Sequence, residues 1–559
     1  MNKALSSGHV PWVLYGIVLA LVSAAAFGGA VDQDWSFDDE DYIAAAQRAR
    51  HDLWYVFSPD KPVQATNARG ASRPAVHLYY LALYGLFDGA PSGYHVMSVV
   101  LHTLVAFLLA LSIASMGGGR IGSFSAGLLF LINLSHLRAV FWAAAVAFLL
   151  AALFGLAAFL AMSRTAGAKS KKRSWMASVL FLAAVCAHES AIAFLFPILY
   201  LLRHRPRKEM AIAAGPFLVA VGAVLVLSLF VYDTPITMQG GERTEEVAEI
   251  SQGEVHVGPH ILTNMALYVS DIVVGVARDV RWVRWTVPTR VALGCLFLGL
   301  LIYSTVRRPR LRIAAAWIVV ATLPFAPWDS GTLAWRYHYL PATGVCAVLG
   351  LLLSRGGRYG ARIFRWGPLA WMIPTSLVAL SFFVSLPLIK YTQAVQHSYS
   401  GQYLRRQGEY GRAKTQYDFA ISKGGDHPTT FLFQYGSALC LLGLSETGRA
   451  HSAFRDLVRD HPTYAPAIQW FLRVHGRRAG WPGALLDPSG RITNKRALEE
   501  YLHRDIRSAA MEKRWMDASA LCIGFLSLFP ETPEIRQVLV TSNRNLGDNP
   551  SGEDMETPR

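Results

Sequence analysis

Apolar runs of bilayer length, separated by short charged connections, dominate the hydrophobic pattern of this chain. A run of roughly 20 apolar residues predicts a membrane-spanning helix. The pattern predicts about eleven such helices, followed by a region in which apolar runs shorten and charges become frequent. The predicted spans are about 11–31, 94–116, 121–137, 139–163, 175–187, 189–202, 210–232, 290–306, 312–328, 338–354 and 367–389.

One apolar stretch, residues 175–202, allows two interpretations. A single long helix would place the basic segment 203–208 on the outer side of the membrane. That would oppose the tendency of Lys and Arg to remain in cytoplasmic loops. Two short helices that meet at His188 and Glu189 keep the basic segment inside, so we favour two. This arrangement places an ionisable pair at an outer turn.

Composition supports a polytopic membrane protein. Of 559 residues, 53% are hydrophobic and 16% are charged, and the mean hydropathy is +0.29; this is too apolar for a soluble chain of such length. The net charge of +15 comes from basic clusters between apolar runs, which topology explains better than nucleic-acid binding. We therefore expect a retained first span, a cytoplasmic N-terminus, and an extracytoplasmic segment from residue 390 onward.

The segment 390–542 has a helical pattern with recurring small and aromatic positions. Small residues let paired helices approach, and aromatic residues fill the groove between them. The spacing resembles degenerate tetratricopeptide repeats of roughly 34 residues. The polar tail 543–559 is expected to be disordered.

An acidic cluster follows the first apolar run, and it includes Asp38, Asp39, Glu40 and Asp41. Carboxylates at the mouth of a membrane domain are costly unless they face water, a metal or a substrate. The cluster therefore indicates chemistry at the outer membrane surface. The five cysteines show neither metal-ligand spacing nor a dense disulfide pattern.

Four segments together resemble the GT-C superfamily of membrane glycosyltransferases, and in particular the protein O-mannosyltransferase-related proteins with C-terminal tetratricopeptide repeats. The segments are 37–43 (FDDEDYI), 73–102 with its RP, LF, GYH and LH elements, 188–191 (HESA), and 336–341 (RYHYLP). The resemblance implies an all-α fold. It consists of a polytopic domain 1–389 with a catalytic outer loop at about 32–93, then a solenoid of repeats over 390–542.

One segment departs from the family pattern. Residues 133–142 keep His136 and Trp142, but Arg138 occupies the usual acidic position. Val146 and Phe148 stand where the family carries an Arg and an Asp. This departure leaves room for a divergent or inactive member.

By resemblance, Asp38 or Asp39 is the base that takes the proton of the acceptor hydroxyl. The alternative for the pair is a solvated loop or a helix cap. Positive charge at the departing phosphate is also required, and the candidate substrate-binding residues are Arg73, His95, Arg138, His188, Glu189, Arg336 and Tyr337. No motif requires a cofactor, and a divalent cation near Asp39 remains an open alternative.

The expected function is transfer of a sugar from a polyprenyl-phosphate-linked donor to an acceptor hydroxyl, with protein Ser/Thr as the first acceptor. Expected partners are that donor, a protein or glycan acceptor, membrane lipids, and proteins bound through the repeats. One alternative is a non-catalytic scaffold of an envelope complex; another is an enzyme that modifies a lipid or polysaccharide. The richness in Ala and Arg and the lack of outer Asn-X-Ser/Thr sites favour a bacterial inner membrane.

Overall fold

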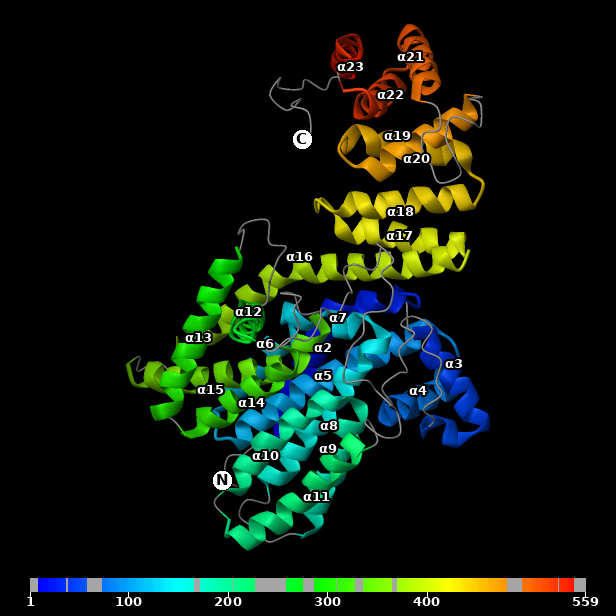
Figure 1. The fold of residues 1–559 in the computed structure, drawn as a ribbon. Helices are drawn as coiled ribbons and strands as arrows, with labels where there is room; N and C mark the ends of the chain where they lie inside the picture. The colour runs from blue at the N-terminus through cyan, green and yellow to red at the C-terminus, as the bar shows by residue number, and fades with distance from the viewer. Residues whose placement is uncertain are drawn as a thin grey trace. The chain divides into compact units, whose positions relative to one another are not determined.

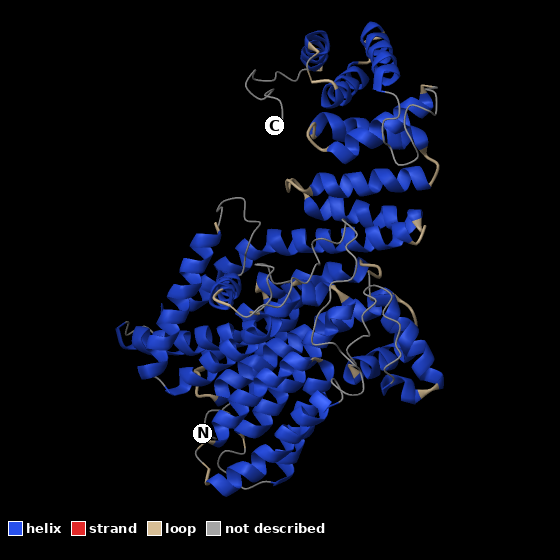
Figure 2. Cartoon of the chain, viewed as in Figure 1, coloured by secondary structure: helices blue, strands red, loops and turns tan. Residues whose placement is uncertain are grey.

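Helices and the turns between them account for the described chain, which contains no strand (Figure 2). The structure, a computed structural model, describes residues 9–36, 39–57, 73–164, 171–203, 205–226, 258–274, 286–307, 309–326, 335–363, 369–479, 495–530 and 532–546. The predicted all-α fold class is therefore confirmed.

The chain forms two compact units, Met1–Gln396 and His397–Arg559. The elements up to the boundary are α2 (His9–Phe27), η1 (Gly28–Asp32), α3 (Asp39–His51), η2 (Leu53–Phe57), α4 (Pro74–Phe87), α5 (Pro91–Ser115), α6 (Arg120–Leu131), η3 (Leu134–His136), α7 (Arg138–Phe141), η4 (Ala143–Ala145), α8 (Val146–Ser163), α9 (Lys171–Ala187), η5 (Glu189–Phe194), α10 (Leu195–Leu202), α11 (Arg207–Val226), α12 (His260–Val274), α13 (Val287–Arg307), α14 (Pro309–Thr322), η8 (Leu323–Phe325), η9 (Trp335–His338), α15 (Tyr339–Ile363) and α16 (Leu369–Arg406), where η marks a 3₁₀ turn and α16 crosses the boundary.

The first unit is held together by close helix packing around α5 and α8 (Figure 1). Helix α8 carries no charged residue, and most of its side chains are buried. Helices α6 and α15 approach closely because Gly122 and Gly350 face each other; a Cβ on either would collide with the backbone of the other helix. Small residues at such crossings are typical of membrane helix pairs.

Five of the described helical stretches are long and apolar enough to cross a bilayer. They are Trp12–Asp32, Pro91–Ser115, Ala143–Ser163, Val287–Val306 and Arg336–Ser354. The chain is accordingly an integral membrane protein. Several further apolar helices are shorter than a bilayer is thick, so the count of about eleven spans stays a prediction.

The structure interrupts the apolar stretch 175–202 at His188, where α9 ends and η5 and α10 follow. His188 is extended, with φ −158° and ψ 132°, and its side chain caps the turn by accepting a hydrogen bond from the Ser190 backbone N–H. The predicted helix break is confirmed, and the separate membrane crossing of the two segments stays a prediction.

Helix α12 was not predicted, because the sequence pattern gave no span between 210–232 and 290–306. The helix has only 15 residues and includes Asn264, Ser270 and Asp271, so its apolar pattern is short and interrupted. Tyr268 and Ile272 are nevertheless fully buried in the first unit. The acidic residues Glu242 to Glu254 lie outside the described residues.

The second unit consists of helix pairs that stack in chain order (Figure 1). Small residues allow the pairs to approach, because a Cβ at Gly436 would collide with the Tyr417 ring and one at Gly443 with the Tyr410 ring. The helices after α16 are α17 (Tyr410–Gly424), α18 (Thr430–Gly443), α19 (Thr447–Asp460), α20 (Ala465–Arg478), α21 (Lys495–Met511), α22 (Trp515–Leu528) and α23 (Pro533–Asn545). Helix α23 thus includes residues 543–545 of the predicted disordered tail, whereas 547–559 lie outside the described residues.

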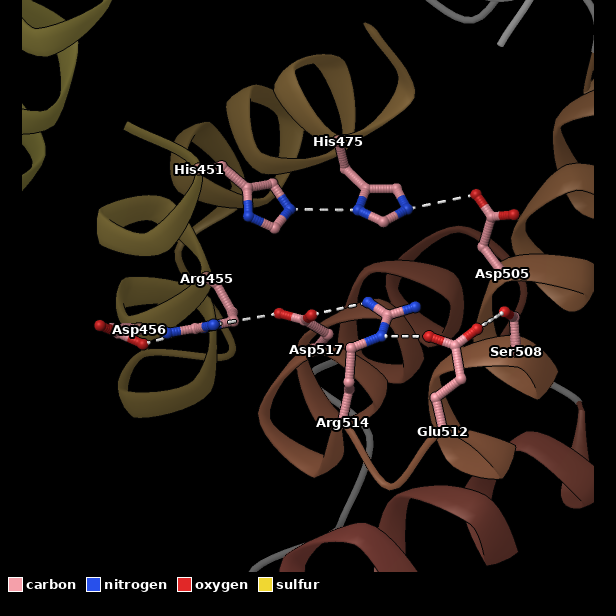
Figure 3. A network of polar contacts seen from close by, with 9 residues as sticks. All are labelled: His451, Arg455, Asp456, His475, Asp505, Ser508, Glu512, Arg514 and Asp517. Carbon is pink, nitrogen blue, oxygen red and sulfur yellow. Dashed lines mark hydrogen bonds and ion pairs between the residues drawn. The ribbon is translucent and has the colours of Figure 1, made fainter. Parts of the chain in front are cut away.

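Two polar chains join four helices of this unit (Figure 3). His451 Nε2 lies 3.1 Å from His475 Nδ1, and His475 Nε2 lies 3.2 Å from Asp505 Oδ2. Asp517 accepts hydrogen bonds from Arg455 on α19 at 3.1 Å and from Arg514 at 2.8 Å. Because His451, His475, Asp505 and Asp517 are largely shielded from water, their hydrogen bonds fix how successive helix pairs pack.

Candidate functional site

Two of the predicted site residues meet at the start of helix α4. Arg73 occupies the position before Pro74, and its Nη2 atom lies 3.4 Å from Oε1 of Glu189 in η5. The two residues are 116 positions apart in sequence. The same Glu189 oxygen lies 3.6 Å from Nε2 of His188, so one carboxylate faces both a guanidinium and an imidazole.

The orientation of His188 follows from its other nitrogen. Nδ1 lies 3.2 Å from the backbone N–H of Ser190, which can only donate, so Nδ1 is the unprotonated acceptor. The ring proton is therefore on Nε2, which faces Glu189. The His188 side chain is buried, and its ring packs 4.2 Å from that of Phe148. Nε2 makes no hydrogen bond within the described residues, so its contact with Glu189 is electrostatic.

A second group of predicted residues gathers around Trp142. The guanidinium carbon of Arg336 lies 5.0 Å from the centre of the Trp142 ring, and that of Arg138 lies 5.6 Å away. Arg336 also stacks on Tyr337 at 4.7 Å and donates to its hydroxyl at 3.3 Å. Cations above aromatic rings are attracted by the ring electrons, so the aromatic side chains position both guanidinium groups.

The two groups meet at Phe148. Its ring lies between His188 and Tyr337, with the Tyr337 ring 5.4 Å away at nearly a right angle. Electrostatic interactions also run between Arg336 and His188, and between Arg73 and Tyr337. We call Arg73, Arg138 and Arg336 the arginine cluster. The structure thus brings six of the nine predicted site residues into one region.

The arginine cluster brings three guanidinium groups into this region beside the Glu189 carboxylate. Burial lowers the pKa of Arg73, but Glu189, Tyr42 and Tyr337 together outweigh this effect and raise the pKa above its usual value. The guanidinium therefore stays charged. Its Nε atom is buried and has no hydrogen-bond partner among the described residues. Glu189 is 56% exposed, so the region opens to solvent. Fixed guanidinium groups beside one exposed carboxylate suit an anionic ligand such as a phosphate.

Asp39 occupies the first position of α3, and its side chain is fully buried. Oδ2 accepts hydrogen bonds from the backbone N–H and the hydroxyl of Ser36, at 2.8 Å and 3.1 Å. Oδ1 accepts one from the backbone N–H of Ala144 at 2.6 Å. The carboxylate therefore ties the start of α3 to the segment that follows Trp142. Asp38, the other predicted base, lies outside the described residues.

His95 lies on α5, and its buried ring is 6.4 Å from that of Trp35. Trp35 in turn packs edge-on against Tyr94 at 5.0 Å. The structure thus places His95 within an aromatic cluster of α5 and the segment before α3.

A buried ion pair between α12 and α13 was missed by the sequence analysis. Arg290 Nε donates to Asp271 Oδ1 at 2.8 Å, and its Nη2 contacts both carboxylate oxygens. The pair lies near His338, with which both partners interact electrostatically. His338 in turn lies 3.1 Å from the Ser135 carbonyl oxygen through Nδ1. A carboxylate inside an apolar stretch was the signal that could have identified this pair.

No group of three or more His, Cys, Asp or Glu side chains in the described part of the chain could hold a metal ion. The described residues therefore identify no ligand set for the divalent cation that the sequence left open.

No protein-family model matches the chain. A curated relative, the human "Protein O-mannosyl-transferase TMTC4", is 26% identical over 209 residues, which cover 33% of this chain. The matched part spans 28% of that relative's length. A solved structure, ArnT from Cupriavidus metallidurans bound to undecaprenyl phosphate, aligns with a TM-score of 0.41 at 13% identity, covering 80% of each chain. The match to the human protein confirms the predicted resemblance to O-mannosyltransferase-related membrane proteins.

Proposed function

We propose that this chain is a membrane glycosyltransferase that moves a sugar from a polyprenyl-phosphate carrier to an acceptor hydroxyl. The observation that carries the proposal is the arginine cluster. Arg73, Arg138 and Arg336 come from three distant segments and share one region with His188, Glu189 and Tyr337. A lipid-linked donor leaves a phosphate at the membrane surface, where fixed guanidinium groups would stabilise its charge.

In the proposed reaction, the acceptor oxygen attacks the anomeric carbon as the bond from that carbon to the phosphate oxygen breaks. The transition state resembles an oxocarbenium ion. The polyprenyl phosphate departs with its charge against the arginine cluster, and the acceptor proton passes to a carboxylate. His188 and Glu189 would hold Arg73 at the angle that phosphate binding requires.

We assign the base to Asp38 and a positioning role to Asp39. The support is the bonding of Asp39, whose two oxygens already accept hydrogen bonds from Ser36 and Ala144. A buried carboxylate held by three donors is a poor base, because such bonds stabilise its charged form. Asp38 directly precedes Asp39 in sequence and is the other carboxylate of the predicted pair.

For the acceptor, we propose a protein Ser or Thr hydroxyl, recruited by the helical repeats of the second unit. Repeat solenoids form extended binding surfaces, and the printed name of the matched human relative is that of a protein O-mannosyltransferase. We place the reaction on the extracytoplasmic side of a bacterial inner membrane, with the N-terminus in the cytoplasm. A lipid or polysaccharide acceptor is the alternative within the same chemistry.

A non-catalytic scaffold is the second candidate. It is favoured by Val146 and Phe148, which replace the Arg and Asp of the related enzymes, and by the structural use of Asp39. Only the enzyme needs a free carboxylate at position 38, so the two candidates differ in one testable way.

The test is a mass-spectrometric comparison of glycans on envelope proteins and surface polysaccharides. It uses a deletion strain complemented with wild type, with Asp38→Asn, or with Glu40→Gln as a matched control of the same acidic segment. A glycoform restored by wild type and the control but not by Asp38→Asn supports the enzyme and reveals its acceptor. Full restoration by well-expressed Asp38→Asn would contradict the assignment and favour the scaffold.

A further inference from the structure

The turn η2, which follows α3, exposes an unusual group of large apolar side chains. Trp54 is 80% exposed, Leu53 is 59% exposed and Phe57 is 47% exposed. Trp54 and Phe57 lie with their ring centres 6.1 Å apart. Isolated exposed apolar residues are normal, but three of them within five residues of one rigid turn indicate a surface that is covered in use.

The turn is fixed rather than loosely attached. Val56 is fully buried, and α3 and α4 both pack against η2. Asp52 accepts a hydrogen bond from the Trp54 backbone N–H at 3.0 Å, and Arg48 donates to the Tyr55 hydroxyl at 3.2 Å. The local structure therefore directs Leu53, Trp54 and Phe57 outward while Val56 holds the turn to the body.

Basic residues border this surface. The last turn of α3 carries Arg48, Arg50 and His51, all exposed, while the acidic residues of α3 are confined to its first turn. An apolar group with an aromatic member beside exposed basic side chains is the pattern of a segment that lies in a membrane interface. There the rings enter the headgroup region and the basic groups contact anionic lipids.

The position of η2 in the chain also supports contact with a membrane surface. The segment from α3 to α4 is bounded by two candidate membrane spans, Trp12–Asp32 before it and Pro91–Ser115 after it. Both ends of the segment therefore start at one membrane surface. Helix α4 packs against η2. Its residue Leu86, shortly before the second of these spans, is 73% exposed.

We propose that η2 is a membrane-surface anchor, in which Leu53, Trp54 and Phe57 enter the lipid interface and Arg48 and Arg50 bind anionic headgroups. This anchor would fix the depth of α3 and α4, which carry Asp39 and Arg73, relative to the bilayer. The inference concerns lipid contact alone, so it holds or fails independently of the proposed transferase activity.

The test labels position 54 with a fluorophore in the full-length protein after Trp54→Cys, with exposed Cys295 replaced by Ser. The protein is reconstituted into vesicles of phosphatidylcholine alone or mixed with phosphatidylglycerol. Quenching by lipids with a nitroxide on the acyl chain is compared with quenching by aqueous iodide. Thr447→Cys, exposed at the start of α19, is the matched control.

The anchor predicts severalfold stronger nitroxide quenching at position 54 than at 447, together with protection from iodide. Arg48→Gln/Arg50→Gln should reduce that nitroxide quenching in the phosphatidylglycerol vesicles and leave it unchanged in phosphatidylcholine. Equal quenching at both positions would overturn the proposal. Protection from iodide without nitroxide quenching would also overturn it, because a protein partner or second copy would then cover the turn.

Discussion

The carboxylate of Asp39 accepts a hydrogen bond from the backbone N–H of Ala144 at 2.6 Å, across 105 positions of sequence. This contact joins the start of helix α3 to the segment that carries Trp142, on which Arg138 and Arg336 stack. The acidic pair that the sequence singled out therefore has divided roles in our account. We propose that Asp39 holds the site together and that Asp38 takes the proton of the acceptor.

Substitutions at the two positions should separate these roles. Asp39→Asn replaces one acceptor oxygen by an NH2 group, so buried donors lose a partner, at a cost of about 1–3 kcal/mol. The thermal midpoint of the purified protein should fall. Asp38→Asn should leave that midpoint unchanged while lowering the transfer rate by roughly 10²–10⁴-fold. If Asp38→Asn lowered the thermal midpoint and Asp39→Asn lowered only the transfer rate, the two assignments would have to be exchanged.

Glu189→Gln should affect donor binding more than stability. The Arg73–Glu189 pair is partly exposed, and exposed ion pairs contribute only about 0–1 kcal/mol. Loss of the Glu189 charge would nevertheless free Arg73 to move, so KM for the lipid-linked donor should rise while the melting temperature stays nearly constant. Parallel steady-state kinetics and thermal unfolding check this. An unchanged KM for the donor would show that Glu189 has no role in donor binding.

Substitutions in the Asp271–Arg290 pair should instead lower stability strongly, because both side chains are more than nine-tenths buried. Removing one partner leaves an uncompensated charge in an apolar environment and should cost about 3–5 kcal/mol. Asp271→Asn and Arg290→Gln should therefore each lower the yield and the melting temperature. The double variant Asp271→Leu/Arg290→Met should recover most of the loss. A double variant as unstable as the single ones would assign the pair a role beyond charge neutralisation.

The second unit should loosen in acid. Burial lowers the pKa of His451 to about 4, and His475 beside it adds to this effect (Figure 3). The folded-state pKa lies below the usual value of 6.5, so the unfolded chain binds the proton first. The stability of the folded unit is therefore greatest above pH about 6.5 and falls as pH drops from about 6.5 to about 4.

Hydrogen–deuterium exchange of peptides from α19 and α20, corrected for the intrinsic effect of pH, measures this change. Protection should fall between pH about 6.5 and 4 in the wild type. His451→Gln should show a smaller dependence on pH, because it cannot gain the charge. Equal pH dependence of both proteins would contradict the assignment to His451.

The sequence was most informative where one residue type has a strong local consequence. Apolar runs predicted each of the five described stretches that are long enough to cross a bilayer, and the basic segment 203–208 correctly favoured a helix break at His188. Helix α12 was missed because its 15 residues include Asp271, whose charge is tolerated only through Arg290 on another helix. The bonding of Asp39 to Ala144 was equally inaccessible, since this contact depends on tertiary packing.

Binding of a short polyprenyl phosphate tests the central claim most directly. Farnesyl phosphate, with farnesol as the matched ligand lacking phosphate, would be titrated against the purified full-length protein and against Arg73→Gln, Arg138→Gln and Arg336→Gln. The account predicts that wild type prefers farnesyl phosphate and that Arg73→Gln and Arg336→Gln each weaken it about tenfold or more, as expected for a lost charged hydrogen bond. A well-folded triple variant that binds farnesyl phosphate as tightly as wild type would contradict the arginine cluster as a phosphate site.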